Sequence, residues 1–139
     1  MYVTQFDAVW TRTEYPYVDE PYAKAVFTVH TIHPQSLTAI SNMHVSSIDT
    51  DYGHEHKRTK TNFNQSLIMS SYLMAEVVGQ FELIEEFCND EKLPMWIYTL
   101  PGQIDQANFT LESAVRAIEY LSEFIQIQFQ VFKLVLFRT

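Results

Sequence analysis

Residues 23–32 read Ala-Lys-Ala-Val-Phe-Thr-Val-His-Thr-Ile, and their pattern sets the class of the first half of the chain. β-branched side chains alternate with other residues here, as they do on a strand with one buried face. His33-Pro34-Gln35-Ser36 follows and is predicted to be a turn, after which Leu37–Ser41 begins the next strand. This succession of strand, turn and strand is typical of an antiparallel sheet.

Two later segments fit the same architecture. Residues 49–61 are polar and charged around Gly53, and we predict that they form a solvated hairpin loop between strands. Residues 71–87 are a longer β-rich stretch, interrupted at Gly79, where a bulge or a close backbone approach would fit. The chain is therefore predicted to be mainly β, with residues 1–86 forming an antiparallel β-sandwich.

The periodicity changes in the last third of the chain. Met95–Thr99 is predicted to be a strand, and Pro101-Gly102 a turn. Apolar residues then recur at the spacing of an amphipathic helix of about five to six turns. They are Ile104, Ala107, Leu111, Ala114, Val115, Ile118, Leu121 and Ile125. Val131–Phe137 again has strand character, so residues 87–139 are predicted to form a strand–helix–strand unit.

Composition excludes several classes of protein. With 47% apolar and 14% aromatic residues, the 139-residue chain can bury a core. Nine basic and seventeen acidic residues give a net charge of −8, which argues against nucleic acid as a partner. Cys88 is the single cysteine, so neither an internal disulfide nor a multi-cysteine zinc cage is expected. No apolar run approaches the roughly 18 residues of a transmembrane segment.

An ordered series of short matches extends over nearly the whole chain. It begins with Thr4-Gln5-Phe6-Asp7, Arg12 and Tyr15-Pro16-Tyr17-Val18-Asp19-Glu20-Pro21, and continues with Ser71-Tyr72-Leu73, Val78-Gly79-Gln80-Phe81, Tyr98-Thr99 and Asp105-Gln106-Ala107. In this order and spacing the chain resembles the zinc metalloaminopeptidases of the aminopeptidase N and puromycin-sensitive aminopeptidase family, peptidase family M1. The resemblance implies a partial N-terminal β-sandwich domain over residues 1–86. It further implies the truncated start of a thermolysin-like catalytic domain over residues 87–139.

The family's activity is the zinc-dependent hydrolysis of N-terminal amino acids from peptides, yet the 139 residues contain no His-Glu-x-x-His motif. We therefore expect a fragment or short paralogue that is not catalytic by itself, with no catalytic residue, metal ligand or cofactor of its own. The alternative is a non-catalytic binding or decoy module that pairs with a protein partner through an open sheet edge. Replacement of the family's Cys and aromatic residue by Tyr17 and Val18 favours that alternative. A decayed gene product is a third possibility.

Two residues are assigned a substrate-binding role by the resemblance alone. Gln5 corresponds to the glutamine that lines the pocket for the first substrate side chain, and Asp7 to the residue that holds the free α-amino group. A carboxylate beside an ammonium group makes a charge-assisted hydrogen bond, which suits that role. Peptide N-termini are therefore the expected ligands. Family members are cell-surface, secreted or cytosolic, so no location is predicted.

Two motifs could be mistaken for catalytic or metal centres. In Asp19-Glu20-Pro21 the neighbouring carboxylates cannot share one face of a strand, so we predict a structural role, with Arg12 as the partner. In His54-Glu55-His56 the two imidazoles could converge on a metal ion, because alternate residues of a strand share a face. The basic side chains at Lys57, Arg58 and Lys60 oppose a cation, and a polar hairpin tip is the preferred interpretation.

Overall fold

The computed structural model describes residues 1–7, 10–53, 57–88, 93–126 and 134–137. The chain folds as two compact units, Met1–Gln80 and Phe81–Thr139, called unit 1 and unit 2 from here on. Within the described ranges, no helix combines the length and the apolar character needed to cross a membrane.

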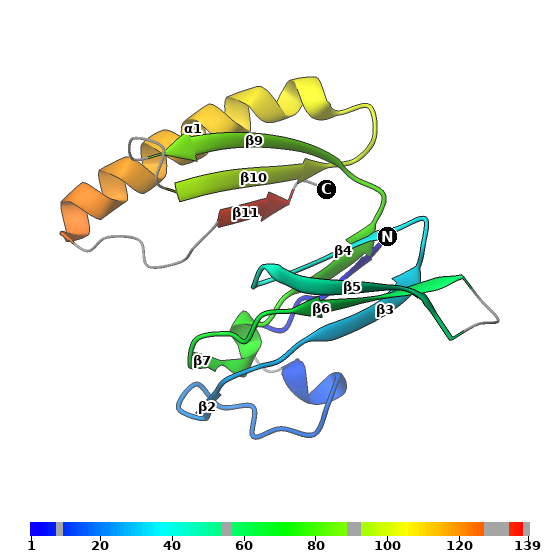
Figure 1. Cartoon of the computed structure of the whole chain (residues 1–139). Coiled ribbons are helices and arrows are strands. Elements are labelled where there is room, and N and C mark those ends of the chain that lie inside the picture. Colours follow the sequence, from blue (N-terminus) through cyan, green and yellow to red (C-terminus); the bar gives the residue numbers. More distant parts are fainter. Residues whose placement is uncertain (8–9, 54–56, 89–92, 127–133, 138–139) are drawn as a thin grey trace. The chain divides into compact units, whose positions relative to one another are not determined.

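Unit 1 consists of short strands and two single-turn 3₁₀ helices (Figure 1). In chain order they are β1 (Tyr2–Val3), η1 (Thr11–Thr13), β2 (Lys24–Ala25), β3 (His30–Pro34), β4 (Thr38–Ser41), β5 (Val45–Tyr52), β6 (Arg58–Phe63), β7 (Met69–Ser70), η2 (Ser71–Leu73) and β8 (Glu76–Gly79). The strands pair in the orders β1-β8-β4, β3-β6-β5 and β2-β7, and every pairing is antiparallel. The predicted antiparallel β-sandwich class is confirmed.

The strand predicted over residues 23–32 is divided in the structure. Only its two ends belong to ladders, as β2 and as the start of β3. Between them, Phe27 bonds Ser66 instead: its amide donates to Ser66 Oγ over 2.9 Å, and its carbonyl accepts from the Ser66 amide over 2.9 Å. The Ser66 side chain thus takes the place of one backbone acceptor of a β-ladder. The alternation of β-branched residues in the sequence could not reveal this substitution.

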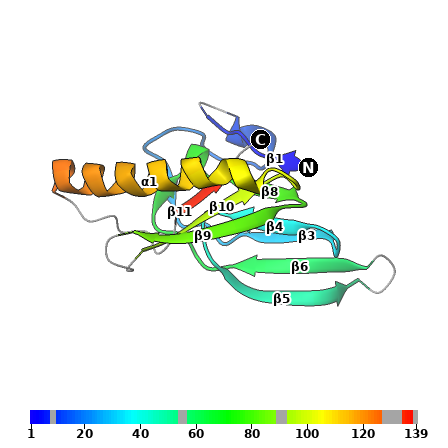
Figure 2. The ribbon, with the colours of Figure 1, turned by 90° about the horizontal axis from the view of Figure 1, so that it is seen from above.

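β5 and β6 form the predicted hairpin, and both strands extend into residues that were expected to form its loop (Figure 2). Pairs such as Asp49 with Lys60 and Tyr52 with Arg58 extend the ladder toward the turn. Gly53 has a φ of +76°, which glycine adopts without steric cost. Polar side chains led to the loop prediction, whereas the backbone groups of the same residues pair across the hairpin.

The interior of unit 1 is largely polar. Its buried apolar residues are Phe6, Ala39, Ile40, Phe63 and Met74. Its buried polar residues are Thr11, Asp19, His33, Ser41, Thr59, Thr61, Ser66, Ser70 and Ser71. Several of these bond one another or distant backbone: His33 Nε2 lies 2.9 Å from Thr61 Oγ1, and Ser41 Oγ donates to the Ala75 carbonyl over 2.9 Å. Buried polar groups are tolerated when they are paired in this way.

Unit 2 is a three-stranded sheet with one helix over a face (Figure 1). Its elements are β9 (Glu82–Cys88), β10 (Leu93–Thr99), α1 (Ile104–Ile125) and β11 (Leu134–Phe137). In the order β11-β10-β9, β10 pairs antiparallel with β9 and parallel with β11. The core consists of Met95, Ile97, Ala107 and Leu111, against which Ile84, Ala114, Val115 and Ile118 pack. The predicted strand, turn and helix are confirmed, with Gly102 at a φ of +81° in the turn.

The apolar face of α1 packs against the sheet along only part of the helix. Leu121 and Ile125 belong to the predicted apolar stripe but are 46% and 55% exposed. A helix of 22 residues is about 33 Å long at 1.5 Å per residue. The 7 residues of β10 span only about 23 Å at 3.3 Å each. The helix is therefore longer than the strand on which it packs, and the described residues do not cover its last turns.

The β-rich stretch predicted over residues 71–87 also divides. Its first three residues form η2, the break at Gly79 ends β8, and β9 pairs with β10 in unit 2. The assignment of residues 1–86 and 87–139 to two family domains stays a prediction.

Candidate functional site

The loop that follows β1 presents Gln5 and Asp7. Thr4 holds this loop to β8, because its amide donates to the Glu76 carbonyl over 3.0 Å and its Oγ1 accepts from the Glu76 amide over 2.9 Å. Phe6 is buried, at 5% exposure, while Gln5 and Asp7 on either side of it are exposed. The structure therefore brings the two predicted residues to one anchored loop and turns both toward solvent.

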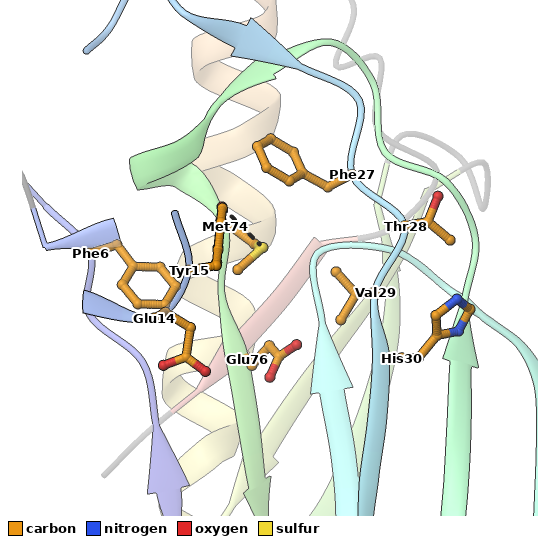
Figure 3. Close-up of a pocket in the computed structure, with 9 residues that line it drawn as sticks. All are labelled: Phe6, Glu14, Tyr15, Phe27, Thr28, Val29, His30, Met74 and Glu76. Carbon is orange, nitrogen blue, oxygen red and sulfur yellow. Dashed lines mark hydrogen bonds between the residues drawn. The ribbon is translucent and has the colours of Figure 1, made fainter. Parts of the chain in front are cut away.

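A cleft of about 450 Å³ lies in unit 1 beside this loop (Figure 3). Its lining residues are Phe6, Glu14, Tyr15, Phe27, Thr28, Val29, His30, Met74 and Glu76. Gln5 and Asp7 are not among them. The cleft and the exposed loop are therefore two distinct candidate sites that share the buried Phe6 as a boundary.

Aromatic rings form one wall of the cleft. Tyr15 meets Phe27 edge-on at a centroid distance of 6.4 Å, and Tyr17 packs against Tyr15 at 5.9 Å and Phe27 at 6.0 Å. The Tyr15 hydroxyl donates to Met74 Sδ over 3.9 Å, and the Tyr17 hydroxyl donates to the Ala23 carbonyl. Tyr17, where the family has cysteine, is thus a packing residue here, whereas Val18 is 59% exposed. These contacts pack the three rings against one another and tie Tyr15 to Met74 and Tyr17 to Ala23.

Two carboxylates face the same cleft (Figure 3). Glu14 is exposed and accepts a hydrogen bond of 3.4 Å from the Tyr2 hydroxyl, while Glu76 is half-buried on β8. Burial raises the pKa of the Glu76 carboxyl, and the neighbouring charge of Glu14 raises it further. Burial also raises the pKa of Tyr15 to about 12, with smaller contributions from Tyr17 and nearby carboxylates. The cleft therefore concentrates negative charge in a partly desolvated place.

The Asp19-Glu20-Pro21 motif has the predicted structural partner. Asp19 Oδ2 lies 3.7 Å from Arg12 Nε and accepts from the Arg12 amide over 3.3 Å. Its other oxygen accepts from Ser71 Oγ over 3.1 Å. Asp19 is buried whereas Glu20 is exposed, so the two neighbouring carboxylates share no site. The aspartate joins η1 to η2 and is not positioned as an acid or base.

The described residues do not fit a zinc site. In those parts of the chain, no three His, Cys, Asp or Glu side chains come together as a metal ion would require. His33 is buried and bonds Thr61, and His30 Nδ1 lies 2.8 Å from Asn62 Oδ1, so both histidines have structural partners. The His54-Glu55-His56 motif lies outside the described residues.

Sequence reasoning missed the cleft carboxylates. Glu14 follows η1, and Glu76 begins β8, so only the folded chain places them together. One signal was available: Glu76 stands at the start of the apolar Val77-Val78 strand, where a charged residue is unusual.

Comparisons with known proteins agree with the resemblance in the sequence. Residues 1–73 match the family model of the peptidase M1 N-terminal domain. The puromycin-sensitive aminopeptidase of Caenorhabditis elegans is 37% identical over 91% of this chain, and the glutamyl aminopeptidase of Homo sapiens is 30% identical over 94%. The chain spans 13% of the length of each of these relatives. Aminopeptidase N of Bos taurus is 34% identical over 67% of the chain and 10% of its own length. With more than half of its residues inside the family model, this chain belongs to the peptidase M1 family of aminopeptidases.

Proposed function

We propose that this chain supplies substrate recognition for aminopeptidase chemistry, with the loop of Gln5 and Asp7 binding the free N-terminus of a peptide. The observation that carries the proposal is the anchored loop, in which buried Phe6 and the paired Thr4 fix the backbone beneath two exposed polar side chains. Hydrolysis is not assigned to these 139 residues, because their sequence holds no His-Glu-x-x-His motif.

The chemistry of the loop suits an α-ammonium group. The Asp7 carboxylate accepts hydrogen bonds from the ammonium protons, and the opposite charges strengthen each bond. The Gln5 side chain both donates and accepts, so it can contact the first peptide unit or its side chain. Acetylation of the peptide removes the charge and leaves one N–H donor. Selectivity for a free N-terminus is therefore the property to measure.

The test is a nuclear magnetic resonance titration of the ¹⁵N-labelled chain with trialanine amide and with its N-acetyl derivative. We expect the free peptide, and not the acetylated one, to shift the amide signals of residues 4–7. Asp7→Asn should weaken binding about fivefold, the loss of roughly 1 kcal/mol from an exposed charged contact. Asp105→Asn, an exposed aspartate in unit 2, is the matched control. Equal binding of the two peptides would remove this proposal.

A second candidate function, a non-catalytic module with a protein partner, is favoured by β5. This edge strand is exposed along all 8 residues. Ile48 is 58% exposed although its paired residue Thr61 is buried, and Val45 is 42% exposed opposite buried Phe63. Paired residues of antiparallel strands share a face, so the covered face of β6 continues onto β5 without cover from the described residues.

Strand addition at this edge would complete the sheet. If β5 receives a partner strand from a second copy, sedimentation velocity should show association that increases with protein concentration. Ile48→Lys should abolish it by placing a charge on the uncovered face, and Leu73→Lys, which changes an exposed residue of η2, should not. A chain that stays monomeric up to the highest soluble concentration would rule out self-pairing through β5.

A further inference from the structure

We propose that the cleft of unit 1 binds an organic cation, an ammonium or guanidinium group on an aliphatic stem, such as a lysine or arginine side chain of a peptide. This site is separate from the loop of Gln5 and Asp7, and it recognises a side-chain charge and not an α-amino group. The argument rests on the volume, the aromatic wall and the two carboxylates of the cleft.

The volume of the cleft suits a small group. At about 450 Å³ it lies within the roughly 300–1,000 Å³ that is typical of small-ligand sites. Phe6 and Met74 are buried at one side, at 5% and 8% exposure, so this part of the wall is packed before any ligand arrives. A preformed wall lowers the entropy cost of binding.

The wall is chemically suited to a cation with an apolar stem. The rings of Phe6, Tyr15 and Phe27 line the cleft with the Met74 side chain (Figure 3). Aromatic faces attract ammonium and guanidinium groups, and methionine packs against aliphatic carbon. The edge-on contact between Tyr15 and Phe27 presents the two rings at an interplanar angle of 61°. Methylene groups would pack on this wall while the charge lies near its end.

The carboxylates supply the charge. Glu76 is half-buried, and its carboxylate has neither a hydrogen bond nor an ion pair with the described residues. Its backbone is held by Thr4, so the side chain projects from a fixed strand. Glu14 adds a second negative charge at the same place. A bound cation would offset part of this negative charge, and its N–H groups would replace the water that Glu76 has lost.

Other ligand classes fit less well. Anions are repelled by Glu14 and Glu76, and a neutral apolar ligand would desolvate Glu76 without compensating its charge. Among the described residues, the other titratable groups that line or adjoin the cleft are Tyr2, Tyr15, Tyr17 and His30. Burial raises the pKa of Tyr2 and of Tyr15 further above the ordinary 10.0, so both hydroxyls are neutral at pH 7. An organic cation is the ligand whose charge and shape both match the lining.

The experiment uses probes whose two ends are blocked. Nα-acetyl-lysine amide and Nα-acetyl-arginine amide carry a side-chain cation but no α-amino group, and Nα-acetyl-norleucine amide has the same aliphatic stem without charge. We expect the two cationic probes to shift the amide signals of Tyr15, Phe27 and Glu76 in the ¹⁵N-labelled chain. Added salt should weaken their binding, because it screens the partly exposed carboxylates.

Variants connect the binding to the carboxylates. Glu76→Gln should raise the Kd for the lysine probe about tenfold, as the loss of a charge-assisted contact predicts. Glu20→Gln, an equal change of charge at an exposed residue outside the cleft, should leave the Kd unchanged. If Glu76→Gln disturbs the folded spectrum, the exposed Glu14→Gln provides the second measurement, with an expected threefold rise of about 0.7 kcal/mol.

Equal binding of the norleucine and lysine probes would overturn the proposal, as would an unchanged Kd in both carboxylate variants. Because the probes lack an α-amino group, Asp7→Asn should not alter their binding. Failure here therefore leaves the loop of Gln5 and Asp7 untouched, and failure of the free-peptide titration leaves the cleft untouched.

Discussion

Unit 1 and unit 2 bury different kinds of residue. In unit 2 a helix covers a sheet, and the buried centre is apolar, with Met95 and Ile97 from β10 facing Ala107 and Leu111 from α1. In unit 1 short strands and single turns bury threonine, serine, histidine and aspartate side chains, several of which bond across the interior, although Thr11 Oγ1 has no partner among the described residues. The same chain thus uses apolar area in one half and paired polar groups in the other.

This difference has a physical consequence. Apolar burial is non-directional, so a core such as that of unit 2 loses stability in proportion to the area and volume removed. A polar interior depends on individual partners, because each unpaired buried group costs about 1–3 kcal/mol. Unit 1 should therefore be sensitive to small changes of chemistry, and unit 2 to changes of size.

The largest effect is expected from Leu111→Ala in unit 2. Leu111 is buried at 6% exposure, and its truncation should lower the free energy of unfolding of unit 2 by about 2–5 kcal/mol. Urea titration followed by ¹⁵N–¹H spectra would report the two units separately. Leu121→Ala, on the same helix but 46% exposed, should cost less than about 1 kcal/mol. Similar losses in the two variants would contradict the apolar-core description.

A smaller loss is expected from Asp19→Ala in unit 1. The substitution leaves Ser71 Oγ and the Arg12 amide without their acceptor, and should cost unit 1 about 1–3 kcal/mol. Hydrogen exchange of unit 1 amides is the measurement, with unit 2 amides as the internal reference. Glu20→Ala, at the neighbouring exposed carboxylate, is the matched control and should change little. Unaltered exchange in Asp19→Ala would show that this pairing does not support unit 1.

The smallest effect is expected from the pH dependence of unit 1. Burial and Glu14 raise the pKa of Glu76 above its ordinary 4.5, so the folded state holds this proton more tightly than the unfolded state. The free energy of unfolding therefore falls as the pH rises from the unfolded-state pKa of Glu76 to its higher folded-state pKa. At pH 7 the ionised carboxylate destabilises unit 1. Glu76→Gln should raise the thermal midpoint at pH 7.

That gain should disappear well below pH 4.5, where both states are protonated. Thermal denaturation of Glu76→Gln and of the wild type, at pH 7 and at a pH well below 4.5, measures the difference between their midpoints. A midpoint difference independent of pH would assign the effect to packing and not to charge.

Sequence patterns predicted the helix, the turn and the central strand of unit 2 well, because each of these elements depends on residues that are close together along the chain. The stripe from Ile104 to Ile118, the turn at Gly102 and the strand around Ile97 follow from spacing and from the conformational freedom of glycine. The ladder across residues 49–52 was missed because side-chain polarity says little about backbone pairing at a solvated edge. The Arg12–Asp19 contact was predicted from opposite charges near a turn and is present at 3.7 Å.

Family membership and the mainly β class could both be read from residues in sequence order, because motifs and periodicities need only neighbours along the chain. The cleft of unit 1 could not be predicted from the sequence. Glu14 and Glu76 line one cleft because β1 and the Thr4 that follows it pair with β8, far away in the sequence. Tyr15 and Phe27, twelve residues apart, likewise meet only in the folded chain. Such contacts depend on which distant strands pair. The free energy of the complete fold decides that pairing, and a local sequence pattern carries no information about it.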